Sequence, residues 1–434
     1  MDRDHAASSV VARRRLKPNK EQTMSLAPTD APALYDPATY VKGVPYDYYR
    51  WLRDNDPVAH LDHPTYSNGY WVVTRHADVQ KVSRDASTFR NAPDPFVDDG
   101  IMGGGEGAGT SELMISLDAP EHIKLRKIVN KGFTPRRVAE LSDRLRARTD
   151  AIIDELADRD GCDLVHDLAL WLPLHVIADM VGVPEEDRAQ VFDWTEKTFG
   201  FDASVTPEER GQATMDMFMY ADAMCAERET NPSDDLMSVL LHAEVDGEQL
   251  TRFQIEVFFM LLQNAGSETT RNLITTGTLA LLEHPDQMAI VANDFDTLPT
   301  AIEELLRFTT PVVHFTRTAN VDTELGGKKI SAGERVLMVY AAANRDERAF
   351  ENPDSIDVLR NPNDHVAFGA GGPHFCLGAN LARLEGRIMF EQILSRFEGL
   401  RVDGDPADFP RVHSNLIDGF SELPITWDRI LPAR

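Results

Sequence analysis

The chain has 434 residues, and its 71 Asp and Glu against 44 Lys and Arg give a net charge of −27. This acidic balance argues against a protein that binds nucleic acid or an anionic membrane surface. Hydrophobic residues make up 42% of the sequence, enough for a sizeable core, yet no apolar run reaches the ~18 residues of a membrane span. The three cysteines, Cys162, Cys225 and Cys376, are too few and too scattered for a disulfide framework, so we expect a cytoplasmic protein.

The first 30 residues are mostly small and polar, and they contain three consecutive arginines at positions 13–15. They include no apolar segment of the kind found in a secretory signal. We therefore expect a disordered N-terminal tail over residues 1–30. A mitochondrial-type presequence is the alternative for the basic stretch, but Asp2, Asp4 and Glu21 argue against it.

The remaining chain is predicted to be helix-rich with a minor sheet. A Ser-Asn-Gly turn before Tyr70 predicts a hairpin over residues 58–74, and 318–340 forms a second strand region. Residues 93–110 form a loop whose length indicates a function. Apolar residues recur every three to four positions, the pattern of helices, in six segments: 136–156, 168–181, 214–228, 252–282, 300–308 and 380–397.

The helix predicted over 252–282 is apolar in its first half and then carries Glu268 and Thr269. Burying a carboxylate or a hydroxyl costs free energy unless the group is paired or used, so both are candidate functional residues. The small residues just before them would let the helix open and leave space for a small molecule. The alternative is that the hydroxyls of this stretch bond to carbonyls of the helix itself, as hydroxyls in helices usually do.

Cys376 lies in the segment Phe368-Gly-Ala-Gly-Gly-Pro-His-Phe-Cys-Leu-Gly378, here called the cysteine loop. Its glycines let the backbone approach a flat cofactor and direct amide N–H groups at an anionic sulfur, while Phe375 and Leu377 exclude water. A free cysteine in a glycine-rich turn is the alternative. The spacing of the glycines, with a His two residues before the cysteine, favours instead a thiolate that binds haem iron and donates electrons to it.

The cysteine loop and the helix start that follows it resemble the cytochrome P-450 signature. The family's other motifs follow in the family's order and cover the chain from about residue 45 to the C-terminus. One departure is that Phe368 lies eight residues before Cys376, whereas the commonest loop has seven. This variant is similar to that of bacterial members acting on methyl-branched lipids, terpenoids and steroid side chains. The other matching motifs are 265–270 of the long helix, Glu304-x-x-Arg307 with Arg360, and His122-x-x-x-Arg126.

The resemblance implies a haem-thiolate monooxygenase with the cytochrome P-450 fold: one large domain, mainly α with small β-sheets, over residues 31–434. Its cofactor would be haem b (heme b, iron protoporphyrin IX), with Cys376 as the iron ligand. Haem propionates are anions and need cationic, hydrogen-bonding partners. For His122 a plain surface position is the alternative. The implied cofactor-binding residues are His122, Arg126, Ala265, Arg317, His374 and Cys376.

The resemblance also implies two catalytic residues. Thr269 would donate a hydrogen bond to the activated oxygen, and Glu268 would relay protons from solvent. Glu304, Arg307 and Arg360 are implied as structural, because a buried charged set is tolerated only when every member is paired.

Substrate-binding residues are expected in the regions that form the pocket of this family. Nearly all of them are apolar, and Met and Phe make adaptable walls, so we expect a hydrophobic small molecule with few polar anchors. The alternative is that many of them belong to the plain core. The candidates are Phe96, Met102, Phe258, Leu261, Leu262, Val312, Val313, Ile417 and Phe420.

We therefore predict a monooxygenase that hydroxylates an unactivated C–H bond of a terpenoid, methyl-branched lipid or steroid side chain. It would use O2 and two electrons from a [2Fe–2S] ferredoxin with an NAD(P)H-dependent reductase. A peroxide-using haem-thiolate enzyme and a non-catalytic haem sensor or ligand-binding protein are the alternatives, and the Glu268–Thr269 pair favours the oxygenase. The cationic stretch 124–137 is the expected ferredoxin surface, with a solvated helix face as the alternative.

Overall fold

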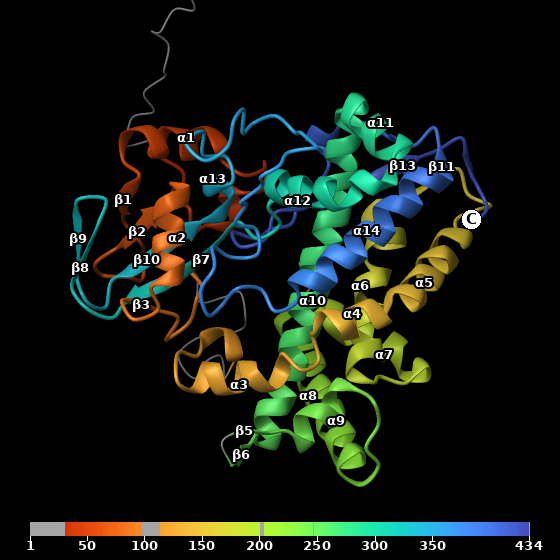
Figure 1. Cartoon of the computed structure of the whole chain (residues 1–434), viewed down its shortest axis with the longest axis horizontal. Helices are drawn as coiled ribbons and strands as arrows, with labels where there is room; N and C mark the ends of the chain where they lie inside the picture. Colours follow the sequence, from red (N-terminus) through yellow and green to blue (C-terminus); the bar gives the residue numbers. More distant parts are fainter. Residues whose placement is uncertain (1–30, 98–112, 200–203, 246, 434) are drawn as a thin grey trace, which may run out of the picture. The chain divides into compact units, whose positions relative to one another are not determined.

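The computed structural model describes residues 31–97, 113–199, 204–245 and 247–433. The chain divides into two compact units, Met1–Ala31 and Pro32–Arg434, and the description below concerns the second. The predicted tail, residues 1–30, lies outside the described residues. Helices dominate the second unit and its strands form small sheets, so the predicted fold class is confirmed (Figure 1).

The main sheet has five strands in the order β1-β2-β10-β7-β3. β1 (Val58–Leu61) and β2 (Tyr70–Val73) form the predicted antiparallel hairpin. β10 (Arg335–Val339) runs parallel to β2 and antiparallel to β7 (His314–Ala319), and β3 (Phe89–Arg90) pairs with the other edge of β7. The second predicted strand region thus joins the hairpin in one sheet, although β7 begins before the predicted boundary at residue 318.

The other elements complete the domain. The helices are α1 (Tyr46–Asn55), α2 (His76–Arg84), α3 (Glu121–Val129), α4 (Pro135–Glu140), α5 (Ser142–Asp154), α6 (Trp171–Val181), α7 (Arg188–Phe199), α8 (Pro207–Thr230), α9 (Leu236–His242), α10 (Arg252–Glu283), α11 (Pro285–Asn293), α12 (Leu298–Thr309), α13 (Tyr340–Ala343) and α14 (Ala379–Arg396). The short strands are β4 (Gly161–Asp163), β5 (Glu244–Val245), β6 (Glu248–Gln249), β8 (Thr323–Leu325), β9 (Lys328–Ile330), β11 (Phe397–Glu398), β12 (Arg401–Val402), β13 (Pro424–Thr426) and β14 (Arg429–Ile430).

The long helix α10 organises the helical part of the domain (Figure 1). It begins at a capping box, in which the Gln254 N–H donates to Thr251 Oγ1 at 3.2 Å and the Thr251 N–H donates to Gln254 Oε1 at 3.0 Å. Most of its side chains are buried, and it packs against α6, α8, α12 and α14. The helix is unbroken past Ala265 and Gly266, so the opening expected there is absent from α10.

Three predicted helices differ in detail from those observed. The predicted helix 214–228 is the central part of the longer α8. The predicted helix 136–156 is divided into α4 and α5 at Leu141. The predicted helix 168–181 corresponds to α6, which follows a π-type turn at Leu164–Ala169. The combined stretch Leu164–Val181 is long and apolar enough to cross a membrane, but 72% of it is buried inside the protein. Its packing against α10 identifies it as a core segment of the domain.

A buried ion-pair network fixes α12. Arg307 donates from Nε and Nη2 to the two carboxylate oxygens of Glu304, both at 2.7 Å, and Arg360 Nε donates to Glu304 Oε2 at 3.0 Å. Arg307 also donates to three backbone carbonyls, those of Asn344, Pro353 and Ser355. Such complete pairing is what makes buried charges tolerable. It attaches α12 to the irregular segment 344–362, which leads directly into the cysteine loop.

Candidate active site

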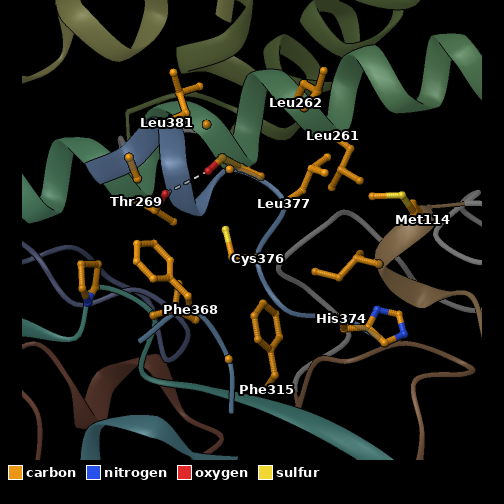
Figure 2. Close-up of a pocket in the computed structure, with 18 of the residues that line it drawn as sticks. Met114, Leu261, Leu262, Thr269, Phe315, Phe368, His374, Cys376, Leu377 and Leu381 are labelled. Carbon is orange, nitrogen blue, oxygen red and sulfur yellow. Dashed lines mark hydrogen bonds between the residues drawn. The ribbon is translucent and has the colours of Figure 1, made fainter. Parts of the chain in front are cut away.

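The backbone of the cysteine loop depends on its glycines. Gly369, Gly371 and Gly372 have φ of +88°, +90° and +88°, in the left-handed region that strains other residues. The Cys376 N–H donates to the Phe368 carbonyl at 2.9 Å, which closes the loop. The sulfur of Cys376 faces the open centre of a cavity (Figure 2).

Helix α2 supports the longer spacing between Phe368 and Cys376. Ser83 Oγ donates to the Gly371 carbonyl at 2.7 Å, and Arg84 Nε donates to the Ala370 carbonyl at 3.0 Å. A Cβ atom on Gly372 would lie 2.3 Å from the Ser83 carbonyl oxygen, so this glycine is needed for the close approach. The loop, with its longer spacing, therefore packs tightly on the end of α2.

The cavity in front of Cys376 is mostly apolar. It contains about 1440 Å³ of space unfilled by atoms, including its opening to solvent. One wall is α10, and β7 and its preceding segment form another (Figure 2). Candidate residues that line the cavity are His122, Arg126, Phe258, Leu261, Leu262, Ala265, Thr269, Val312, Arg317, His374 and Cys376.

Four of these candidates form a polar cluster at the cavity. The rings of His122 on α3 and His374 in the cysteine loop stack with their centres 3.9 Å apart. Arg126 Nη2 donates to the Phe375 carbonyl at 2.5 Å, and Arg317 Nη1 donates to the Thr316 carbonyl at 2.8 Å. Residues distant in the sequence are thus brought together by α3, β7 and the cysteine loop.

No member of this cluster forms an ion pair within the described residues, although the charge of Asp118 acts on His122 and Arg317. His122 Nε2 is buried there without a hydrogen-bond partner. Burial, with a smaller contribution from Arg126, lowers the pKa of His122 to about 4, and burial also lowers the pKa values of His374 and Arg317. Desolvated cationic and hydrogen-bonding groups are stabilised when an anion binds between them. Two carboxylates on the edge of a flat apolar macrocycle, as in haem, fit this cluster and the cavity.

The surroundings of Cys376 combine opposing effects on its ionisation. Burial by the surrounding protein raises the pKa of its thiol, even though the sulfur is open to the cavity. The N–H groups of Gly378 and Ala379 and the charges of Arg126 and Arg383 act in the other direction, because they favour the thiolate. An iron ion at the sulfur would complete this stabilisation, since a metal-bound thiol is deprotonated.

The two catalytic candidates on α10 occupy different environments. Thr269 lines the cavity, and its Oγ1 donates to the Ala265 carbonyl at 2.9 Å (Figure 2). Glu268 is buried away from the described cavity lining and pairs with Arg271, which also reaches Glu196 on α7 at 3.3 Å. Burial raises the pKa of Glu268 to about 7, against the lowering effect of Arg271. In this structure the Thr269 hydroxyl bonds to a carbonyl of its own helix, which is the alternative considered for the hydroxyls of this stretch.

One acidic residue that lines the cavity was missed by the sequence analysis. Glu385 on α14 lines the cavity with Thr270, its hydrogen-bond partner, and is 1% exposed. Burial raises its pKa to about 8, and its Oε2 has no partner among the described residues. A signal existed in the sequence, because Leu381, Glu385 and Ile388 follow helical spacing and place the acid on an apolar face.

The remaining substrate candidates lie behind the wall or away from it. Phe96 and Ile417 pack in a cluster behind Val312 and Phe315. Within the described part of the chain, Val313 and Phe420 are not in the cavity lining. Val313 is turned into the core because side chains alternate along an extended segment, and Phe420 is a core residue under Arg411. Met102 lies outside the described residues.

Comparison with known proteins identifies the family. The cytochrome P450 family model matches residues 174–412. The chain is 40% identical over 401 residues to a steroid C26-monooxygenase from Rhodococcus jostii, covering 90% of this chain and 84% of the relative. It is 42% identical over 368 residues to a methyl-branched lipid omega-hydroxylase from Mycobacterium tuberculosis, covering 83% and 84%. This chain belongs to the cytochrome P450 family.

Solved structures agree with this assignment. A P450 from Novosphingobium aromaticivorans matches with a TM-score of 0.82 and 35% identity, covering 91% of this chain and 97% of that one. A Mycobacterium marinum P450 in complex with pseudoionone matches with a TM-score of 0.79 and 36% identity, covering 88% and 94%. The protein is thus a P450 monooxygenase whose cofactor is haem, with a hydrophobic substrate, O2 and redox partners.

The position of Cys376 generates a spectroscopic prediction. We expect Cys376→His to remove the red-shifted Soret band that a thiolate ligand gives the reduced carbon monoxide complex. Cys162→Ser and Cys225→Ser are the controls, because neither residue lines the cavity, and both should keep the band. A normal red-shifted band in Cys376→His would exclude this residue as the ligand.

Proposed function

We propose that this P450 hydroxylates an unactivated C–H bond of a steroid side chain, a methyl-branched lipid or a terpenoid. The observation that carries the proposal is the apolar cavity in front of Cys376, walled by Phe258, Leu261, Leu262 and Val312. Such walls bind a hydrophobic molecule by burying its surface, with few polar groups to fix its orientation. The names of the steroid and branched-lipid relatives support the same substrate classes.

The proposed roles of the cofactor-binding residues follow from their positions. When bound, haem supplies the oxygen-activating chemistry. Cys376 is the iron ligand, and Arg126, Arg317, His122 and His374 hold the propionates. Ala265 has a side chain small enough to leave room on the cavity side of α10.

Thr269 and Glu268 are the proposed catalytic pair. The Thr269 hydroxyl reaches the cavity and can turn from the Ala265 carbonyl to hold a proton at Oγ1. Glu268 has a pKa of about 7 because of its burial, so it can both take up and release a proton at neutral pH. Its ion pair with Arg271 and the half-buried Glu196 provides a polar connection toward α7. Proton delivery then requires Glu268 to leave Arg271.

The electron donor is proposed to be a [2Fe–2S] ferredoxin, served by an NAD(P)H-dependent reductase, that docks on α3 and the residues after it. Lys127 and Lys131 are exposed and have no ion-pair partner in the described part of the chain, whereas Arg136 and Arg137 pair with acidic residues. The Arg126 bond to the Phe375 carbonyl joins α3 to the cysteine loop, so an electron arriving here is close to Cys376. A local cationic patch can steer an acidic partner although the whole chain carries −27.

We also propose that the protein works in the cytoplasm. All three cysteines are free thiols in the structure, which suits a reducing compartment.

The substrate proposal is tested by spectral titration. Steroids, methyl-branched lipids and terpenes added to the ferric protein should shift its Soret band. Leu261→Trp should weaken binding by at least about 10-fold, which is ~1.4 kcal/mol, because the indole occupies cavity space. Leu359→Trp, at a half-exposed position outside the cavity lining, is the matched control. Absence of a shift with every apolar class would reject the proposal.

The role of Thr269 is tested by coupling measurements. Thr269→Ala should retain haem and substrate but divert electrons to hydrogen peroxide, since loss of a relay group typically costs ~10²–10⁴-fold in proton transfer. Thr269→Ser should restore coupling. Ser267→Ala is the matched control, because the Ser267 hydroxyl donates to the Gln263 carbonyl outside the cavity lining. Unchanged product per NADH in Thr269→Ala would disprove the role.

The docking proposal is tested by electron-transfer kinetics. Reversal of Lys127 and Lys131 to Glu should slow the first electron transfer and flatten its dependence on ionic strength, with substrate affinity unchanged. A double variant of Lys42→Glu and Lys329→Glu changes the net charge equally at exposed sites outside α3. Equal slowing in both double variants, or in neither, would place docking elsewhere.

A further inference from the structure

A cation rests on the aromatic ring at the start of the cysteine loop. The guanidinium carbon of Arg383, on α14, lies 4.5 Å from the centre of the Phe368 ring, a cation–π distance. The Phe368 carbonyl is also the acceptor for the Cys376 N–H. Phe368 therefore contacts Arg383 through its ring and Cys376 through its backbone, and the charge of Arg383 is among those that favour the Cys376 thiolate.

The orientation of Arg383 is fixed by Glu303 on α12. Arg383 donates from Nε and Nη2 to the two carboxylate oxygens of Glu303, at 2.6 Å and 2.8 Å. Such a bidentate pair is directional as well as strong. The neighbouring Glu304 pairs instead with Arg307 and Arg360, so consecutive residues of α12 serve two separate networks.

A histidine completes the set. His365 Nδ1 accepts the Ala367 N–H at 3.2 Å, so the ring proton is on Nε2, which donates to Glu303 Oε2 at 3.0 Å. Burial alone would raise the pKa of Glu303, but the hydrogen bonds from Arg383 and His365 lower it to about 2. Glu303 is therefore a fixed negative charge at neutral pH, beside the fixed positive charge of Arg383.

We propose that the Arg383–Glu303 pair sets the reduction potential of the haem iron, with its two charges acting in opposite directions. With haem bound, one electron from the redox partner would reduce ferric to ferrous iron, and no bond would have to form or break. The added negative charge is stabilised by the positive charge of Arg383 and destabilised by the negative charge of Glu303. Both are positioning residues, since neither lines the cavity among the described residues.

The signs of the two shifts give the test. In the haem-loaded full chain, spectroelectrochemistry should find a lower potential in Arg383→Gln and a higher one in Glu303→Gln, with the double variant near the unmodified protein. Because the Arg383 side chain is 34% exposed and partly screened, we expect about a 3- to 10-fold change in the reduction equilibrium, or ~30–60 mV for one electron. Arg383→Lys keeps the charge and should keep the potential.

Arg387→Gln is the matched control. It removes the same charge one turn further along α14, from an exposed residue, and should leave the potential unchanged. A purely structural pair would respond differently, because Arg383→Gln and Glu303→Gln break the same contact and would shift the potential in the same direction. That result, or no shift in either variant, would overturn the proposal. If Arg383→Gln fails to bind haem, Glu303→Gln and Arg383→Lys still decide it, the first by a raised potential and the second by an unchanged one.

Discussion

The position of the cysteine loop depends on one constraint, the fully buried carboxylate of Glu304 on α12. A charge without water must be neutralised and hydrogen-bonded on every side, and Arg307 and Arg360 can do this only if α12 and the segment 344–362 keep one relative position. That segment has little regular secondary structure to hold it. The ion pairs of Glu304 and the carbonyl contacts of Arg307 therefore hold in place a segment that has few backbone hydrogen bonds of its own. Because the cysteine loop follows this segment in the chain, its first residue is held in place as well.

Two other buried carboxyls have fewer partners among the described residues: Glu268 pairs with Arg271, and Glu385 is hydrogen-bonded to Thr270. Glu268 and Glu385 lie on different helices, and desolvation raises the pKa of each carboxyl into the neutral range. Glu304, by contrast, is paired with both Arg307 and Arg360. Buried glutamates thus occur in two kinds of setting in this domain, and the two settings differ in the number of cationic neighbours around the carboxylate.

The sequence predicted those parts of the structure that follow from local pattern. The span of α10 was predicted closely because its apolar residues recur at helical spacing along its whole length, and the hairpin of β1 and β2 was predicted from its turn. The cavity wall was predicted less well. Val312 and Val313 are adjacent and chemically alike, and only the register of the segment after α12 decides which of them faces the cavity. Phe420 is indistinguishable in sequence from a pocket residue, yet long-range packing under Arg411 places it in the core. Glu385 was not predicted as a site residue, because its helix was recognised only by the spacing of its apolar residues.

The contact between α2 and the cysteine loop bears on how such loops are exchanged between relatives. Ser83 and Arg84 hold the carbonyls of Gly371 and Ala370, and Gly372 lies against the Ser83 backbone without room for a Cβ atom. A loop of the commoner, shorter spacing would leave the end of α2 with unpaired donors and an unfilled gap. The two segments are nearly 300 residues apart in the sequence, yet they pack as one structural unit. A chimera that transplants the loop has to carry the end of α2 with it.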